Sequence, residues 1–138
     1  MVWKRPIVNT RFHIDWDWWT ASEQNYRLYL HDQLCEECRL QFPSPFDVGD
    51  VDWVDPNTAE VTRADALMMC LRTQCAQDAN YINPTLPLAA AVFRIFLVND
   101  NKALSPVELN EHLPWRDAKT ILRVIGARQT HYGIRPVE

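Results

Sequence analysis

Four cysteines in two close pairs are the residues of this 138-residue chain whose type and spacing best fit a chemical role. Cys35 and Cys38 lie in the segment HDQLCEECRLQF, and Cys70 and Cys75 follow after a gap of 31 residues. A CxxC turn brings two sulfurs to one metal ion, and a distant second pair completes the tetrahedral site that zinc prefers. The spacing therefore predicts a structural Zn²⁺ ion, with no coordination position left open for catalysis.

The second cysteine pair fits this zinc site less simply than the first. If one helix ran unbroken through residues 63–76, Cys70 and Cys75 would point about 140° apart around its axis. We therefore expect either that the helix ends between them or that another residue supplies the fourth ligand. His31, four residues before Cys35, is the first substitute, and His13 is the second.

Two other roles of the cysteines stay open beside zinc. All four can be buried thiols that pack like small apolar side chains. A redox pair needs CxxC at the start of a helix, where the helix N-terminus lowers the thiol pKa. Here the motif follows a predicted helix, and Glu36 and Glu37 between the two cysteines disfavour thiolates. Structural zinc is the interpretation that matches the spacing best.

A second candidate site lies near the C-terminus, in WRDAKTILRVIGAR. Its apolar residues recur at helical spacing on one face, and its cationic and hydroxyl residues share the opposite face. Long cationic side chains on an anchored helix are what contact with DNA phosphates and base edges requires. The candidate nucleic-acid-binding residues are Arg116, Lys119, Thr120, Arg123 and Arg128. The alternative is an ordinary solvated helix face.

In the N-terminal half, the pattern predicts short strands and two helices around the cysteines. Alternation in RFHIDW predicts a strand, and a capping box at Thr20 predicts a helix that runs to about Leu34. Residues 51–62 predict two strands around an Asp-Pro-Asn-Thr turn. A second helix, starting at Thr62, is expected to carry the second cysteine pair.

The last 55 residues predict three helices and an extended end. LPLAAAVFRIFLVND is a strongly apolar helix, Ser105 followed by Pro106 opens another, and a third covers residues 115–127. In this order, the segment 86–138 resembles the winged helix-turn-helix superfamily by pattern, without a diagnostic motif. The segment ends where the second strand of the wing would form. The resemblance implies that the third helix reads DNA.

Charge divides the chain into two parts of opposite sign. Residues 1–83 carry seven lysines and arginines against thirteen aspartates and glutamates, a balance of −6. Residues 84–138 carry seven against five, a balance of +2. A change of sign predicts different partners, with DNA possible for the basic part and a protein partner for the acidic part. The acidic part includes a loop with Asp47, Asp50, Asp52 and Asp55.

Several classes of protein do not fit this sequence. The chain has three glycines and lacks G-x-S-x-G and H-E-x-x-H, so we expect no enzyme and no small-molecule substrate. The N-terminus lacks the apolar run of a signal peptide, and the longest apolar stretch, PLAAAVFRIFLV, is too short for a bilayer. We therefore expect a cytoplasmic protein with no membrane partner.

Together these patterns predict an α+β, mainly helical fold. An acidic, zinc-stapled part, residues 1–83, would pack on a winged helix-turn-helix-like part, residues 84–138. The expected function is that of a small zinc-containing DNA-binding or transcription-associated protein. The alternative is a non-catalytic adaptor subunit of a larger nucleoprotein machine, which binds protein rather than DNA bases. A third hypothesis is a regulator that releases metal when Cys35 and Cys38 are oxidised.

Overall fold

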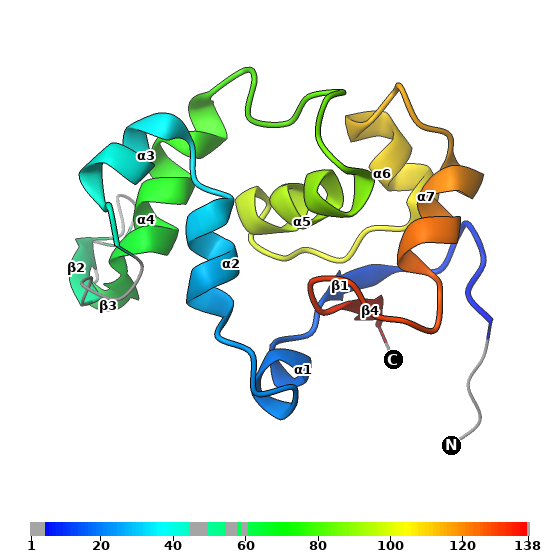
Figure 1. Ribbon diagram of the computed structural model, residues 1–138, viewed down its shortest axis with the longest axis horizontal. Helices are drawn as coiled ribbons and strands as arrows, with labels where there is room; N and C mark the ends of the chain where they lie inside the picture. Colours follow the sequence, from blue (N-terminus) through cyan, green and yellow to red (C-terminus); the bar gives the residue numbers. More distant parts are fainter. Residues whose placement is uncertain (1–4, 45–49, 55–57, 59–60, 138) are drawn as a thin grey trace. The chain divides into compact units, whose positions relative to one another are not determined.

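The computed structural model describes residues 5–44, 50–54, 58 and 61–137, and the fold is mainly helical (Figure 1). The elements in chain order are β1 (Phe12–Ile14), α1 (Trp16–Ala21), α2 (Tyr26–Asp32), α3 (Glu36–Gln41), β2 (Asp50–Val54), β3 (Val61–Asp65), α4 (Ala66–Thr73), the 3₁₀ helix η1 (Cys75–Gln77), α5 (Leu88–Val98), α6 (Pro106–His112), α7 (Ala118–Ile125) and β4 (Ile134–Pro136). The strands form two antiparallel pairs, β1 with β4 and β2 with β3.

The chain forms two compact units, whose division differs from the expected one. Unit 1 combines Met1–Gln24 with Ile82–Glu138, and unit 2 is Asn25–Tyr81. The expected parts were residues 1–83 and 84–138. The first 24 residues belong with the C-terminal segment because β1 pairs with β4. In the sequence, unit 2 is therefore inserted between the two segments of unit 1.

β1 is the central strand of unit 1. On one edge it pairs with β4, which comes from the opposite end of the chain (Figure 1). On the other edge, Phe12 exchanges two backbone hydrogen bonds of 2.8 and 3.0 Å with Leu104. The Asn101 side chain acts there as a further strand partner, since it accepts from the N–H of Ile14 at 2.8 Å and donates to its carbonyl at 2.9 Å.

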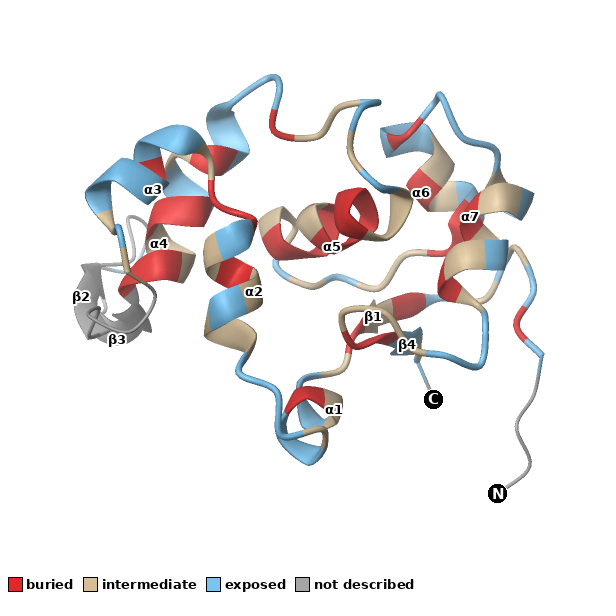
Figure 2. Ribbon diagram, in the orientation of Figure 1, coloured by how far each residue is buried: buried red, intermediate tan, exposed pale blue. Residues whose placement is uncertain are grey.

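α5 supplies seven buried residues to the core of unit 1, which confirms the predicted apolar helix. Buried residues recur along α5 (Figure 2). The helix packs against β1 and α7, and α6 packs against α7. α5 ends where Asp100 and Asn101 adopt left-handed backbone angles, with φ of 64° and 57°. Such angles are tolerated best by Gly, Asn and Asp, which is why the Asn-Asp-Asn segment marks the end of the helix.

The helices α6 and α7 begin at side-chain caps. Ser105 accepts from the N–H of Glu108 at 3.2 Å, and the Glu108 carboxylate accepts from the N–H of Ser105 at 3.0 Å. This capping box confirms the predicted start of α6. The predicted start of the third helix near residue 115 is wrong, because the carboxylate of Asp117 caps the helix and α7 begins at Ala118.

The single helix predicted from Thr20 to Leu34 is also wrong, because the chain forms two short helices there. Asp15 caps α1 and Asn25 caps α2, each through a side-chain oxygen that accepts a backbone N–H of the first turn. Between the helices, Glu23 has a left-handed φ of 59°. The two caps therefore outweigh the helical periodicity of the apolar residues.

In unit 2, the structure confirms the two strands predicted within residues 51–62, while turn residues 55–57 lie outside the described part. β3 extends to Asp65, so the helix predicted to start at Thr62 starts at Ala66 instead. The residues that would have formed the first turn of the predicted helix belong to β3 instead. They pair with β2 in a register that places Asp50 opposite Asp65.

Candidate metal centre

The four cysteines of unit 2 come from three elements. Cys35 is the N-cap residue of α3, and Cys38 lies in the first turn of that helix. Cys70 is a buried residue of α4, and Cys75 is the buried first residue of η1. α3 and α4 pack against each other, and η1 follows α4 directly. The packing of short helices thus brings together pairs that are distant in sequence.

The end of α4 explains how the second pair reaches one site. The sequence left open whether the helix would end between Cys70 and Cys75. α4 ends at Thr73, and the chain then turns into η1, so the two cysteines are not held apart by one regular helix. This confirms the first of the two alternatives.

Three of the cysteine sulfurs form a group that can hold a metal ion. The Sγ atoms of Cys35, Cys38 and Cys75 lie within 4.8 Å of one another. Around tetrahedral zinc, with Zn–S near 2.3 Å, sulfurs are separated by roughly 3.8 Å, so small side-chain movements would complete the geometry. The backbone N–H of Cys35 also donates to Sγ of Cys75 at 3.0 Å.

Cys70, the fourth predicted ligand, is joined to Cys38 by a disulfide, with the two Cα atoms 6.0 Å apart. Cys35 and Cys75 carry their sulfurs as thiols, outside this disulfide. Because Cys38 and Cys70 are bonded, all four cysteines lie in one cluster. A disulfide sulfur is not a thiolate, so coordination by the four predicted ligands requires reduction of this bond.

Neither histidine alternative belongs to the close group of metal-ligand atoms found among the described residues. Nε2 of His31 makes a 2.7 Å hydrogen bond with the carbonyl of Phe42. His13 lies on β1 in unit 1. Among the residues that the structure describes, the close group of metal-ligand atoms consists of cysteines alone.

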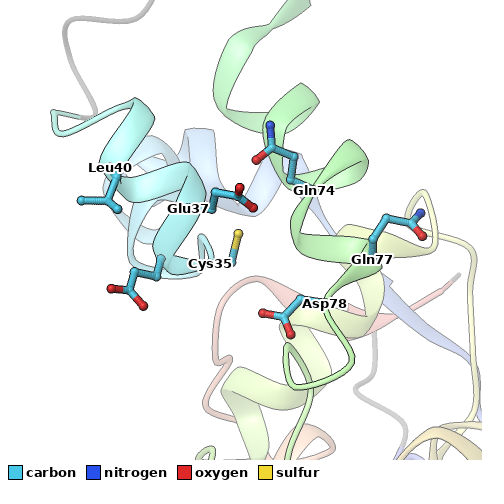
Figure 3. A pocket seen from close by; sticks show the side chains of 7 residues that line it. Cys35, Glu37, Leu40, Gln74, Gln77 and Asp78 are labelled. Carbon is cyan, nitrogen blue, oxygen red and sulfur yellow. The ribbon is translucent and has the colours of Figure 1, made fainter.

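An open pocket of about 520 Å³ lies beside the cluster (Figure 3). Cys35 is half-buried and contributes to the wall of this pocket. The other lining residues are Glu36, Glu37, Leu40, Gln74, Gln77 and Asp78. Sequence reasoning missed the last three because they follow the end of α4, which the pattern could not fix. The three carboxylates make the rim of the pocket acidic.

The CxxC motif begins a helix, and this corrects one premise of the sequence argument against redox chemistry. From the sequence, we expect the motif to follow a helix rather than to begin one. In the structure, Cys35 caps α3 and Cys38 is part of it. The observed disulfide, moreover, joins Cys38 to Cys70 rather than to Cys35. Thiol–disulfide chemistry therefore remains compatible with this site.

The predicted nucleic-acid-binding residues lie in unit 1, on and beside α7. Ile121 and Ile125 are buried, while Lys119 and Arg123 on the same helix are exposed and Thr120 is half-buried. Arg116 precedes the helix and Arg128 follows it, both exposed. Within the described part of the chain, no ion pair involves Arg116, Lys119 or Arg123.

One carboxylate lies close to this cationic face. Asp117 caps α7, and hydrogen bonds from the side chain and then the backbone N–H of Thr120 lower the pKa of its carboxyl. The charges of Arg123 and Lys119 lower this pKa further. Asp117 therefore remains ionised at neutral pH and partly offsets the positive potential of the face.

Two further predictions concern the acidic loop and the absence of a membrane-spanning helix. In the predicted acidic loop, Asp47 and Asp55 lie outside the described residues, and the side chains of Asp50 and Asp52 are also outside them. Among the described helices, none has the length and apolar character needed to cross a membrane.

Comparison with protein-family models, with curated proteins and with solved structures found no match to this chain. The residues of the two candidate sites are therefore the basis for any function of this chain.

Proposed function

We propose that this protein is a small zinc-containing DNA-binding protein, in which α7 contacts DNA and the cysteine cluster holds a structural zinc ion. Thiolates are soft ligands, and a set of four of them favours tetrahedral zinc. The ion would join α3, α4 and η1, three short elements of unit 2.

The observation that carries the DNA-binding proposal is the two-sided character of α7. Ile121 and Ile125 anchor the helix in the core, while Lys119 and Arg123 extend from the opposite side. Exposed cations are available for phosphates, whose contacts supply most of non-specific DNA affinity. Arginine also suits guanine, because its guanidinium donates two parallel hydrogen bonds.

The order of elements in unit 1 supports the same proposal. α5, α6 and α7 are followed by β4, and a five-residue link, Leu113–Asp117, separates α6 from α7. This is the order of the winged helix-turn-helix proteins that the sequence resembles. One difference is that β4 pairs with β1 and not with a strand that follows it among the described residues.

Binding to a fluorescein-labelled duplex of mixed sequence would test the proposal, with anisotropy measured at several salt concentrations. We expect Arg116→Ala with Arg123→Ala to weaken binding at least about tenfold and to reduce the salt slope by about one for each phosphate that the variant no longer neutralises. Lys119→Ala should also weaken binding. Lys102→Ala is its matched control, because it removes the same exposed charge from the segment of unit 1 between α5 and α6.

Asp117→Asn provides a test in the opposite direction. Asparagine caps helices as well as aspartate, so α7 should be retained while one negative charge is removed beside the cationic face. We expect tighter DNA binding, with a larger effect at low salt. Unchanged affinity in this variant and in the arginine variants would overturn the proposal.

The charge of unit 2 favours a second candidate function, that of a non-catalytic adaptor that binds a basic protein. Asn25–Tyr81 carries four lysines and arginines against ten aspartates and glutamates, whereas the rest of the chain carries ten against eight. Such separation of charge suits a protein partner for the acidic unit. An adaptor would show no salt-dependent DNA binding that α7 variants alter.

A further inference from the structure

The accessibility of the four cysteines differs sharply within one cluster. Cys38 and Cys75 are fully buried, and Cys70 is 5% exposed. Cys35 is half-buried and lines the open pocket, where Figure 3 shows it among side chains from α3 and from the segment after α4. A small reagent that arrives from solvent through this pocket therefore meets Cys35 before the other three thiols.

The disulfide, however, joins two of the buried cysteines, Cys38 and Cys70. Oxidation at an exposed thiol can reach a buried pair by thiol–disulfide exchange, provided that the sulfurs are neighbours. Sγ of Cys35 lies within 4.8 Å of Sγ of Cys38, and Cys38 is bonded to Cys70. The cluster thus offers a continuous path from the pocket to the buried bridge.

We propose that the cluster is a peroxide-responsive metal site, in which Cys35 reacts first and the Cys38–Cys70 disulfide is the oxidised end state. The inference depends on the proposed metal binding and adds its regulation. In the reduced state, four thiolates hold the ion. In the oxidised state, two ligands are consumed, the ion leaves, and Cys35 and Cys75 remain as thiols, as in the structure.

Each step balances with hydrogen peroxide as the oxidant. The Cys35 thiolate attacks one peroxide oxygen, which gives a sulfenic acid at Cys35 and releases hydroxide. The Cys38 thiolate then attacks the Cys35 sulfur, forms a Cys35–Cys38 disulfide and releases a second hydroxide. The Cys70 thiolate attacks the Cys38 sulfur, which forms Cys38–Cys70 and frees the Cys35 thiolate. In total, two thiolates lose two electrons and one peroxide becomes two hydroxide ions.

The acidic rim of the pocket determines which reagents reach Cys35. Glu36, Glu37 and Asp78 lie around the thiol and would repel anions, whereas neutral hydrogen peroxide is unaffected. Iodoacetamide and iodoacetate form a matched pair of neutral and anionic reagents. We expect Cys35 to prefer iodoacetamide more strongly than free cysteine does, and Glu36→Gln with Glu37→Gln to reduce that preference. A preference equal to that of free cysteine would contradict this role of the rim.

The decisive experiment follows disulfide formation in reduced, metal-free protein after one equivalent of hydrogen peroxide, by peptide mapping. We expect Cys35→Ser to form the Cys38–Cys70 bridge at least about tenfold more slowly than wild type, because its buried thiols lack the exposed partner. Leu40→Ala is the control, since it changes an exposed side chain of the same pocket, leaves all four thiols in place and should form the bridge at nearly the wild-type rate. Equal rates in Cys35→Ser and Leu40→Ala would overturn the proposal.

Two measurements on wild type do not depend on whether the variants fold. Dimedone added with peroxide should label Cys35, and labelling mainly of Cys38 or Cys70 would contradict the proposed order. Separately, zinc-loaded protein should release its ion to a chromophoric chelator as the bridge forms. A Cys35-dependent bridge in a protein that binds no zinc would refute the metal site while leaving the thiol relay intact.

Discussion

The backbone N–H of Cys35 donates to Sγ of Cys75 at 3.0 Å, across 40 positions of the sequence. This bond joins the start of α3 to the start of η1 and thereby connects the two cysteine pairs. It also shows why the spacing of cysteines in the sequence is not sufficient for a metal site. Each pair must be presented by an element that begins or ends at the correct residue.

Metal binding should depend on Cys75 and not on His31. We expect reduced wild-type protein to bind one zinc ion per chain and Cys75→Ser to bind it at least about 100-fold more weakly, because a thiolate ligand is lost. His31→Ala should bind zinc as wild type does, since this ring contacts the Phe42 carbonyl. Competition with a chromophoric chelator measures the zinc affinity of both variants. Weaker zinc binding by His31→Ala would show that the histidine is a ligand.

Truncation of Phe12 should destabilise unit 1 although this residue lies far in sequence from α5, α6 and α7. Phe12 is fully buried and pairs with both Leu104 and β4. Phe12→Ala should cost about 3–5 kcal/mol of unfolding free energy, by loss of burial and formation of a cavity. Hydrogen exchange should locate the loss in α5–α7. Val137→Ala, at a 42% exposed position, is the control and should have little effect.

Unit 1 should lose stability in acid through Glu108 and Asp117. The backbone N–H of Ser105, followed by its hydroxyl and the charge of Arg11, holds the pKa of Glu108 below its ordinary 4.5. The Thr120 side chain holds the pKa of Asp117 below its ordinary 3.8. Because both pKa values are lower in the folded state, the stabilisation is complete above these ordinary values and is lost as the pH falls through the lowered ones.

Thermal unfolding between about pH 7 and pH 2.5 tests this dependence. In the double variant Glu108→Gln with Asp117→Asn, both caps remain but neither side chain titrates. We expect its melting temperature to change less than that of wild type below about pH 5. An identical acid profile in the two proteins would assign the loss of stability to other groups.

Gly133 should not tolerate a side chain. Its φ is +74°, and a Cβ atom there would lie 2.6 Å from Nε1 of Trp19. That ring is 2% exposed, and its N–H donates to the Tyr132 carbonyl at 3.0 Å, so it has little room to move. Gly133→Ala should therefore cost at least about 1–3 kcal/mol, measurable by urea unfolding. A change below about 0.5 kcal/mol would show that the Trp19 ring can shift.

The sequence by itself determined those features that depend on neighbours along the chain. The apolar run of α5, the Ser105 capping box and the strands within residues 51–62 were all predictable, because each depends on residues a few positions apart. The buried and cationic sides of α7 were predictable for the same reason, since helical periodicity alone defines them.

Only the tertiary structure decided which distant segments meet. The pairing of β1 with β4, which assigns the first 24 residues to the C-terminal unit, leaves no periodic signal in the sequence. The same is true of the bond between Cys38 and Cys70 and of the pocket beside Cys35. Spacing showed that four cysteines could meet. Which thiol faces solvent and which are buried depended on where α4 ended and how α3 packed against it, because burial is decided by packing between elements.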